Sequence, residues 1–322
     1  MFKLINSNDK FFVAGATGMA GSAICRKLKQ YGYGDSSKNG KILTPTRKEL
    51  NLLNYSEVSS WFKSNKPTIT VLAAAKVGGI MANISQPVNF LLENLKIQNN
   101  LIETSWKFGV KRLVFLGSSC IYPKFAIQPI KESYLLKSNL ENSNQWYAIA
   151  KIAGLKLCEN YNFQYGTNYK CLMPANSYGP GDNYDIFTSH FFAANIRKLL
   201  SIKNNNKKDV LIWGSGKVRR ELIFSEDVAD ACVFFLKKKI KEPIINIGNG
   251  SDMTIKAYVQ FIIKKLRMNV KIKFDKTKPD GMPRKLLDVS LAKKYGWTAK
   301  TSLSDGFDKT IKDFLENYKN LK

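Results

Sequence analysis

Two residues of one predicted helix, Tyr147 and Lys151, have the types and spacing needed for proton transfer. Residues four apart lie on one face of a helix, so both side chains reach the same ligand. A tyrosine donates a proton to a carbonyl oxygen as a hydride reaches its carbon, and a neighbouring ammonium is expected to lower the phenol pKa from ~10. Ser118, at the end of an upstream apolar run, is suited to hydrogen-bond the same oxygen. The set predicts reduction of a carbonyl group.

Three glycines near the N-terminus, Gly15, Gly18 and Gly21, form G-x-x-G-x-x-G between an apolar run and a predicted helix. Glycine lets the backbone approach a pyrophosphate, which the helix N-terminus attracts through its free N–H groups and its dipole. Tight turns also use glycine, but a strand before the loop and a helix after it favour a dinucleotide site. The loop residues predicted to contact the cofactor are Gly15, Ala16, Thr17, Gly18, Met19, Ala20 and Gly21.

The end of the second predicted strand indicates which dinucleotide binds. A carboxylate there would hydrogen-bond the ribose 2′-hydroxyl of NAD. This chain has TPTRK (44–48) instead, and its first carboxylate in this stretch is Glu49. Arg47, with Lys48 as a second cation, is suited to a 2′-phosphate, so NADPH/NADP+ is the predicted cofactor. The alternative is an ordinary basic pair on the surface.

The elements that must position these residues follow from apolar runs that alternate with helical periodicity. Apolar runs predict strands at 10–15, 40–45, 68–75, 111–119 and 169–174. Helical spacing predicts helices at 18–31, 56–64, 86–108 and 146–165. This alternation predicts an α/β fold built on a doubly wound, parallel Rossmann sheet, with Ser118 at the end of the fourth strand and Tyr147 at the start of a helix.

The rhythm changes near residue 175, where loops rich in Gly, Pro and Asn begin. We therefore predict an NADP-binding Rossmann domain at 1–175 and a smaller C-terminal α/β lobe for the substrate at 176–322. A strand and a helix near 225–250 are expected to return to the Rossmann domain. The elements expected in this half are strands at 209–214 and 244–248 and helices near 189–201, from 225, near 254–267 and near 303–319.

Composition limits the class of protein. The chain has 322 residues, 44% of them apolar, which is enough for a folded core. It has no apolar run of the ~18 residues that span a bilayer and no signal pattern, so no membrane contact is expected and the cytoplasm is predicted. Its five cysteines are irregularly spaced without a CxxC pair, which predicts reduced thiols and no metal site.

The net charge of +26 has two interpretations. Basic proteins attract polyanions, so a nucleic-acid-binding protein or a non-enzymatic NADP sensor is one alternative. The lysines, however, are spread along the chain and often lie beside asparagines, as in NNNKK at 204–208, which is typical of a coding bias across a proteome. We therefore expect no nucleic-acid partner, and a surface that attracts anionic ligands such as dinucleotides and nucleotide-sugars.

Longer segments resemble a known family. The segments are GSSCIYPKFAIQPIKESYLL (117–136), YAIAKIAGLKLCENYNFQYG (147–166), RKELNLLN (47–54), AAAKVGGI (73–80), WGSGKVRREL (213–222) and KPDGMPRKLLDVS (278–290). They are similar to those of the GDP-L-fucose synthases, which are extended short-chain dehydrogenase/reductases. That family epimerises GDP-4-keto-6-deoxy-D-mannose at C3 and C5 and then reduces C4 with NADPH. The resemblance runs through essentially the whole chain and implies the same bifunctional reaction, which forms GDP-L-fucose.

The resemblance also implies roles for individual residues. Epimerisation next to a ketone needs a base and an acid, and in the family a cysteine and a histidine take these roles; the matching positions are Cys120 and His190. The implied catalytic set is Ser118, Cys120, Tyr147, Lys151 and His190. Besides the glycine loop and Arg47, the implied cofactor contacts are Leu116, Gly117, Lys151, Pro174, Asn176, Ser177 and His190. The implied contacts to the GDP-sugar are Lys198, Trp213, Arg220, Asp280 and Lys285, and a homodimer through the helices at 86–108 and 146–165 is expected.

Several alternatives stay open. Taken alone, Cys120 is typical of a small buried residue, Trp213 of a core residue and Arg220 of a solvated face. Between the first two glycines the family has His-Arg where this chain has Ala16 and Thr17, which makes tolerance of NADH an alternative. The second candidate function is a C4 reductase without epimerase activity, acting on a related GDP-4-keto sugar such as a GDP-4-keto-heptose.

Overall fold

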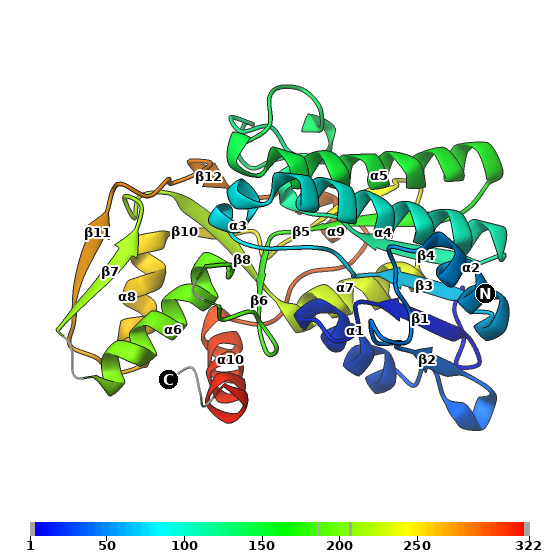
Figure 1. Cartoon of the computed structure of the whole chain (residues 1–322), viewed down its shortest axis with the longest axis horizontal. Helices are drawn as coiled ribbons and strands as arrows, with labels where there is room; N and C mark the ends of the chain where they lie inside the picture. The colour runs from blue at the N-terminus through cyan, green and yellow to red at the C-terminus, as the bar shows by residue number, and fades with distance from the viewer. Residues whose placement is uncertain (1–3, 186, 206–207, 319–322) are drawn as a thin grey trace.

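Six parallel strands form the main sheet of the molecule (Figure 1). The computed structural model describes residues 4–185, 187–205 and 208–318. The strands are β1 (Lys10–Ala14), β2 (Lys41–Leu43), β3 (Ile69–Leu72), β4 (Arg112–Leu116), β5 (Tyr169–Pro174) and β9 (Ile244–Ile247), in the order β2-β1-β3-β4-β5-β9. β3 and β4 are buried throughout, as parallel strands are when helices cover both faces. The predicted α/β fold with a doubly wound Rossmann sheet is confirmed.

Helices cover both faces of this sheet (Figure 1). The helices are α1 (Met19–Gln30) and α7 (Ser225–Lys237) on one face, and α2 (Tyr55–Asn65), α4 (Pro87–Lys107) and α5 (Gln145–Tyr165) on the other. Each buries one apolar side against the sheet; α4, for example, buries Phe90, Ile97 and Leu101, which recur at helical spacing. The catalytic tyrosine and lysine candidates therefore lie on a helix that the core holds firmly.

The direction of winding changes between β1 and β3. β1 pairs in parallel with both β2 and β3, so the chain first moves to one edge of the sheet and then crosses back over β1. In sheets of this kind ligands bind outside the carboxyl ends of the strands, at the point where the winding reverses. Gly15 follows β1 at this point and Ala73 follows β3. The sheet topology alone therefore predicts that a ligand binds next to Gly15 and Ala73.

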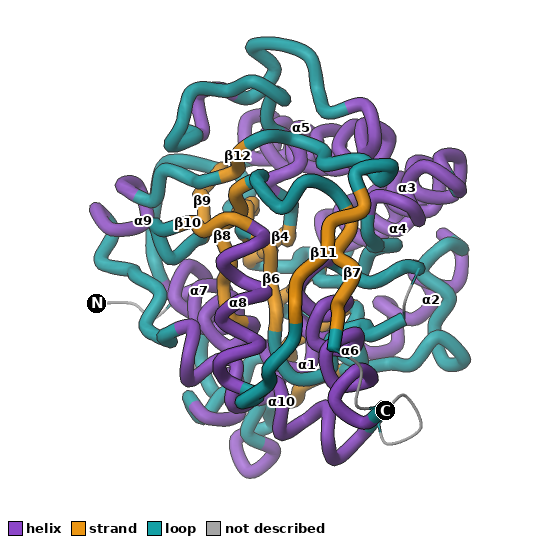
Figure 2. The backbone as a smooth tube through the Cα atoms, turned by 90° about the vertical axis from the view of Figure 1, so that its left-hand side faces the viewer, coloured by secondary structure: helices purple, strands orange, loops and turns teal. Residues whose placement is uncertain are grey.

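The second lobe is a smaller α/β unit with a central strand, β8 (Figures 1 and 2). Its strands are β6 (Asn176–Tyr178), β7 (Asp209–Trp213), β8 (Arg219–Phe224), β10 (Asp252–Thr254), β11 (Lys271–Asp275) and β12 (Arg284–Lys285), and its helices are α6 (Phe191–Asn204), α8 (Ile255–Lys265) and α10 (Leu303–Asn317). β8 pairs with β6, β10 and β12, and β7 pairs separately with β11. A core of its own includes Phe192, Leu222, Val259 and Phe314. The domain boundary at residue 175 stays a prediction.

Several short elements do not follow from the sequence pattern. β8 begins with two arginines, β11 is only partly buried, and β12 has two residues. Two short helices, α3 (Ile80–Ser85) and α9 (Ser290–Lys294), are likewise too short for a periodic signal. Such elements form because distant partners pair and pack with them, which a local pattern does not contain.

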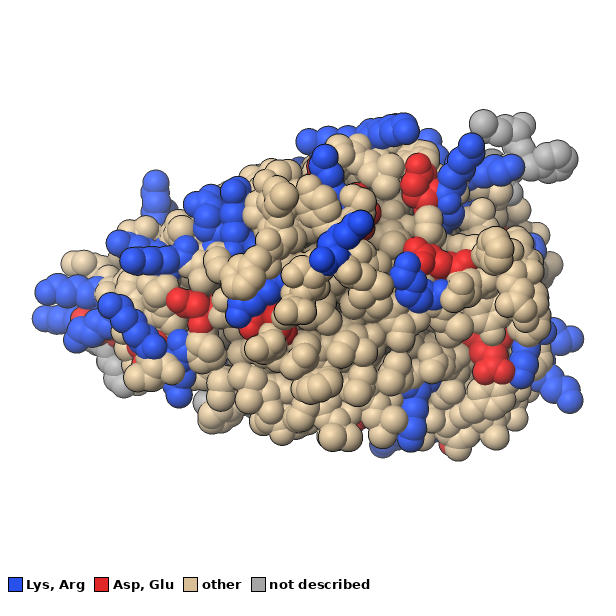
Figure 3. Space-filling view, turned by 90° about the horizontal axis from the view of Figure 1, so that it is seen from above, with Lys and Arg blue, Asp and Glu red and all other residues tan. Residues whose placement is uncertain are grey.

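Basic side chains are spread over the surface (Figure 3). On the face seen from above, Lys and Arg outnumber Asp and Glu and gather at the left end, where β7 and β11 lie in Figure 1. Lys271 and Lys273 of β11 are exposed. Within the described ranges, no helix is both long and apolar enough to cross a membrane.

Candidate active site

In the glycine loop after β1, a side chain at Gly15 or Gly21 would clash with the backbone, whereas a side chain at Gly18 would not. Gly15 has a φ of +82°, and a Cβ there would lie 2.7 Å from the backbone nitrogen of Ala74. A Cβ at Gly21 would lie 2.0 Å from the carbonyl oxygen of Gly15. A Cβ at Gly18 would meet only that oxygen, at an ordinary 3.5 Å. Packing thus leaves the space in front of Gly18 open, as a cradle for a ligand requires.

The N-terminus of α1 faces this cradle. Its N-cap residue, Gly18, makes no side-chain capping bond, and the first turn contains no acidic residue. The first N–H groups of a helix have no partner inside it, and the dipole adds positive potential there. These features fit a pyrophosphate, so the loop is able to hold a dinucleotide.

The loop after β2 presents Arg47 to the same cavity. Arg47 is exposed and lines the cavity, whereas Lys48 is exposed outside it. The Glu49 carboxylate accepts a hydrogen bond from the backbone N–H of Thr46 at 2.7 Å, which lowers the pKa of that carboxyl. The Glu49 carboxylate is therefore bonded within its own turn, and of the charged residues of this loop it is Arg47 that lines the cavity.

Ser118, Tyr147 and Lys151 lie together between the end of β4 and the start of α5. The Lys151 ammonium donates to the carbonyl of Leu116 at 2.9 Å and lies 5.8 Å from the centre of the Tyr147 ring. Burial lowers the pKa of Lys151 to about 7. Because Ser118 follows β4 and Tyr147 begins its helix nearby, a carbonyl oxygen placed between them meets two hydroxyl groups.

The prediction that Lys151 lowers the pKa of Tyr147 is wrong. Burial, with a smaller contribution from Cys120, raises the pKa of Tyr147 above its ordinary value, although a hydrogen bond with Ser118 acts in the opposite direction. The Lys151 ammonium is itself desolvated and points to a carbonyl, so it does not offset this burial. Tyr147 is therefore a neutral phenol at neutral pH, which is the form that donates a proton.

Cys120 has two nitrogen donors at its sulfur. Nδ2 of Asn144 lies 3.2 Å and Nζ of Lys285 lies 3.4 Å from Sγ, and the Cys120 N–H donates to Oγ of Ser118 at 3.1 Å. Burial raises the pKa of this thiol, but Lys285, Ser118 and Arg220 together outweigh burial and bring it below its ordinary value. Cys120 thus has the surroundings of a base rather than of an inert core thiol.

His190 lies directly before α6 and lines the same cavity. Its loop is fixed from the other side, where the N–H of Gly79 donates to the carbonyl of Thr188 at 2.8 Å. The imidazole is accessible from the cavity, yet the surrounding protein and the positive charge of Lys285 lower its pKa. His190 is therefore mainly neutral at neutral pH and open to a ligand.

The far end of the cavity belongs to the second lobe. Trp213 is 38% exposed, so it is not a core residue, and the Lys198 ammonium lies 4.7 Å from its ring centre. Arg220 donates to the carbonyls of Met282 at 2.6 Å and Asp280 at 3.3 Å. An indole face flanked by cations suits a purine base with phosphates attached.

One cavity of about 710 Å³ brings the predicted residues together. It is lined by the whole glycine loop, by all of the catalytic candidates, by all of the other predicted cofactor contacts and by all five predicted substrate contacts. Sequence reasoning missed Asn144, which donates to Cys120, and Lys278, whose ammonium lies 5.6 Å from the Trp213 ring centre. Lys278 was detectable as part of the KPDGMPRK motif; Asn144 gave no signal.

Fold and site together define an extended short-chain dehydrogenase/reductase: a Rossmann sheet with a glycine loop and a Ser/Tyr/Lys set. A sequence model described as the NAD dependent epimerase/dehydratase family matches residues 11–248. GDP-L-fucose synthase 1 of Arabidopsis thaliana is 45% identical over 97% of this chain and 95% of its own length. GDP-L-fucose synthase of Escherichia coli K12 is 43% identical over 97% of this chain and 98% of its own. The chain belongs to the NAD dependent epimerase/dehydratase family and, within it, to the GDP-L-fucose synthase family.

Solved structures agree with this assignment. A GDP-6-OMe-4-keto-L-xylo-heptose reductase of C. jejuni superposes with a TM-score of 0.87 at 35% identity and covers 99% of both chains. A GDP-L-fucose synthetase of Naegleria fowleri, bound to NADP, superposes with a TM-score of 0.87 at 25% identity over 98% of this chain and 96% of its own. Relatives of both kinds therefore share the whole architecture.

Proposed function

We propose that this protein converts GDP-4-dehydro-6-deoxy-D-mannose to GDP-L-fucose, by epimerisation at C3 and C5 and then NADPH-dependent reduction at C4. The observation that carries the proposal is one cavity in which a thiol with two nitrogen donors adjoins the Ser/Tyr/Lys set. The identity of 43–45% to GDP-L-fucose synthases over nearly the whole chain supports the same substrate.

Epimerisation comes first in this mechanism. The 4-keto group acidifies the protons on C3 and C5, and the Cys120 thiolate removes one of them to form an enolate. Ser118 and Tyr147 hydrogen-bond the enolate oxygen, and His190 in its protonated form donates a proton to the opposite face of the carbon. Cys120 then releases the proton it took to solvent, and His190 takes up a proton from solvent, which restores both groups. The Lys285 ammonium beside Sγ favours ionisation of the thiol, because it lowers the pKa of Cys120.

Reduction follows at the same carbonyl. NADPH, when bound, supplies the hydride that reaches C4. The neutral phenol of Tyr147 donates its proton to O4, which leaves a phenolate whose ring centre lies 5.8 Å from the Lys151 nitrogen. The residues proposed to hold the cofactor are Gly15–Gly21, Arg47, Leu116, Gly117, Lys151, Pro174, Asn176, Ser177 and His190.

The GDP part occupies the second-lobe end of the cavity in this proposal. Trp213 stacks on guanine and Lys198 faces the phosphates, whereas Lys285 lies beside Cys120 at the sugar. The Asp280 carboxylate accepts from the N–H of Ser215 at 2.7 Å, so it shapes the loop that carries Trp213 and also borders the sugar nucleotide. Two guanidinium nitrogens of Arg220 donate to backbone carbonyls, and its positive charge faces the diphosphate in this proposal.

The decisive experiment is incubation with GDP-4-keto-6-deoxy-D-mannose and NADPH in D₂O, followed by absorbance, NMR and mass spectrometry. NADPH oxidation with deuterium at both C3 and C5 is expected. Reduction without deuterium would exclude the epimerase half and leave a C4 reductase. That second candidate is favoured by two GDP-heptose reductases of known structure, which cover 97–99% of this chain at 35–36% identity, and a GDP-4-keto-heptose is its test substrate.

Replacing Arg47 by alanine is expected to weaken NADPH binding while leaving NADH binding unchanged. Charge-assisted bonds to a phosphate contribute ~1.5–3 kcal/mol, which corresponds to about 10–100-fold in the Kd for NADPH. Fluorescence titration with both cofactors measures this. Lys48→Ala is the matched control, because Lys48 lies outside the cavity and its loss should change the Kd by less than about twofold. Equal loss for NADH and NADPH would rule out selection by Arg47.

We further propose a cytoplasmic homodimer that pairs through α4 and α5. Val88 and Leu92 of α4 and Ile149 of α5 are exposed to 66%, 46% and 38%. The face that carries these helices has a central area with few charged side chains (Figure 3). Leu92→Lys is expected to convert the dimer to a monomer in sedimentation velocity, whereas Leu211→Lys on β7 of the other lobe should not. A wild-type monomer at micromolar concentration would contradict the proposal.

A further inference from the structure

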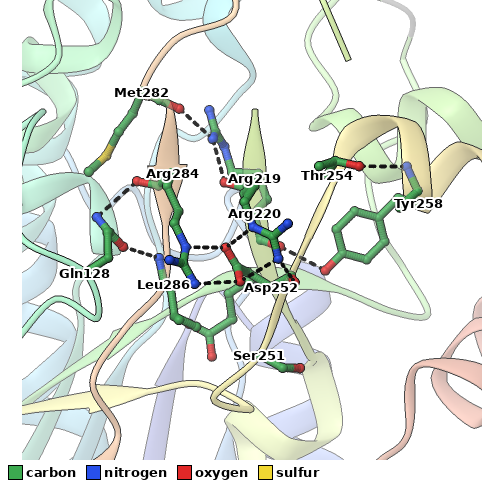
Figure 4. A network of polar contacts seen from close by, with 12 residues as sticks. Gln128, Arg219, Arg220, Ser251, Asp252, Thr254, Tyr258, Met282, Arg284 and Leu286 are labelled. Atoms are coloured by element: carbon green, nitrogen blue, oxygen red, sulfur yellow. Dashed lines mark hydrogen bonds and ion pairs between the residues drawn. The ribbon is translucent and has the colours of Figure 1, made fainter. Parts of the chain in front are cut away.

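A buried carboxylate behind the active site joins two strands that carry site residues (Figure 4). Asp252 of β10 has a side chain only 4% exposed. Its Oδ2 accepts from Nε of Arg219 at 2.9 Å and from Nε of Arg284 at 2.7 Å. Its Oδ1 accepts from a terminal nitrogen of each arginine, at 3.1 and 3.0 Å. Two bidentate forks therefore share one carboxylate, which is the geometry of strong charge-assisted bonding.

The next residue of each strand points the other way, into the cavity. β8 and β12 run parallel, with Arg284 opposite Arg219 and Lys285 opposite Arg220. Successive side chains in a strand alternate between its two faces. Accordingly, Arg220 and Lys285 line the cavity. The three residues of the ion cluster, which are Arg219, Asp252 and Arg284, do not line it. The cluster thus fixes the backbone on which the two site cations stand.

Backbone hydrogen bonds also hold the residues next to β12: the N–H of Arg219 donates to the carbonyl of Pro283 at 2.9 Å, and the N–H of Ile130 donates to the carbonyl of Leu286 at 2.8 Å. β12 is two residues long, and Gln128 holds its outer side by donating to the carbonyl of Arg284 at 3.2 Å and accepting from the N–H of Leu286 at 2.9 Å (Figure 4). Without Asp252, two arginines would face each other on paired strands with no anion between them. Like charges directly opposite one another destabilise strand pairing. Of the two strands, β12 is the one at the edge of the sheet, because β8 is central and paired on both sides.

We propose that Asp252 is a positioning residue that keeps Arg220 and Lys285 in place in the substrate cavity by binding Arg219 and Arg284 behind them. The proposal deepens the proposed function and rests on it only where epimerisation is concerned. Lys285 is the nearer of the two cations to Cys120, at 3.4 Å from its sulfur, and Arg220 is the second positive group that acts on this thiol. Movement of β12 therefore removes the main electrostatic support of the thiolate.

The test uses Asp252→Asn, which keeps the shape of the side chain and removes its charge. The rate of alkylation of Cys120 by iodoacetamide is measured against pH, with peptide-resolved mass spectrometry and the half-buried Cys25 as internal reference. The pH at which the alkylation rate of Cys120 is half-maximal, the midpoint of its profile, is expected to rise. Each pH unit of this rise lowers the alkylation rate at pH 7 by about tenfold. Deuterium incorporation from D₂O should fall in parallel, while the Kd for NADPH stays unchanged.

Two further variants make the result decisive. Arg284→Gln keeps the Asp252–Arg219 pair but removes the ion pair between β12 and β10, so it should raise the same midpoint even where Asp252→Asn folds poorly. Asp209→Asn breaks the exposed pair with Lys273 in the same lobe and should leave the profile unchanged. If Asp252→Asn and Arg284→Gln lower the melting temperature but leave the Cys120 midpoint at its wild-type value, Asp252 is structural only and the proposal is wrong.

The alkylation assay also separates this inference from the proposed function. It needs no sugar substrate, so it reports on Lys285 and Cys120 whichever GDP-sugar the protein uses. Wild-type protein that fails to exchange deuterium would refute the epimerase, while its alkylation profile would still decide the role of Asp252.

Discussion

Tyr147→Phe is expected to lower the rate of NADPH oxidation by about 10²–10⁴-fold at saturating substrate, because it removes the proton that O4 must receive. The phenol is neutral at neutral pH and lies beside Ser118 and Lys151, so no proton has to be recruited from water. The side chain that replaces it fills the same space, and the Kd for NADPH should stay within about twofold. Absorbance of the reduced nicotinamide and a separate binding titration measure the two quantities.

Trp146→Phe is the matched control for this variant. Trp146 precedes Tyr147 on the same helix, is 40% exposed and does not line the cavity. Its replacement should leave oxidation unchanged. Retention of more than about a tenth of wild-type activity in Tyr147→Phe would mean that another group supplies the proton.

Cys120→Ser is expected to reduce deuterium incorporation at C3 and C5 by about 10²-fold or more, because a serine hydroxyl does not ionise near neutral pH. NADPH oxidation should continue more slowly and give a product without solvent deuterium. The comparison variant is Cys25→Ser, whose thiol lies outside the cavity, and it should exchange like wild type. Full exchange in Cys120→Ser would transfer the role of base to another residue.

The same thiol sets the pH dependence of exchange. The pKa of Cys120 lies below its ordinary value, because Lys285, Ser118 and Arg220 outweigh the effect of burial. A lowered pKa keeps the thiolate, and hence exchange, present at pH values below the ~8.5 of a free cysteine, and exchange is lost only as pH falls through the lowered value. Lys285→Met should move this rise in rate toward alkaline pH.

The sequence predicted local features of the site well. The glycine loop, the Ser118 position and the Tyr147/Lys151 pair each depend on a strand end or a helix start, and those elements lie within a few residues of where apolar periodicity places them. The strand and helix boundaries follow from burial on both faces of one sheet. Such information is contained in short windows of sequence.

Contacts between distant segments were not predictable in this way. Lys285 and Cys120 are 165 residues apart in the chain, and they meet because β12 pairs with β8. β12 has no pattern of its own, and β8 begins with two arginines that are typical of a surface. The direction of the Tyr147 pKa was also missed, since it depends on how deeply the folded protein buries the ring.

The late place of β12 in the chain has a consequence for synthesis. A ribosome releases the chain from its N-terminus, and domains fold as their residues emerge. The first five strands of the main sheet end at Pro174, so the glycine loop and Cys120 are made long before Lys285. Until Lys285 has been made, no ammonium lies beside the Cys120 sulfur, and the main cause of its lowered pKa is absent. The lowered pKa of Cys120 is thus acquired only after β12 has been synthesised and has paired with β8.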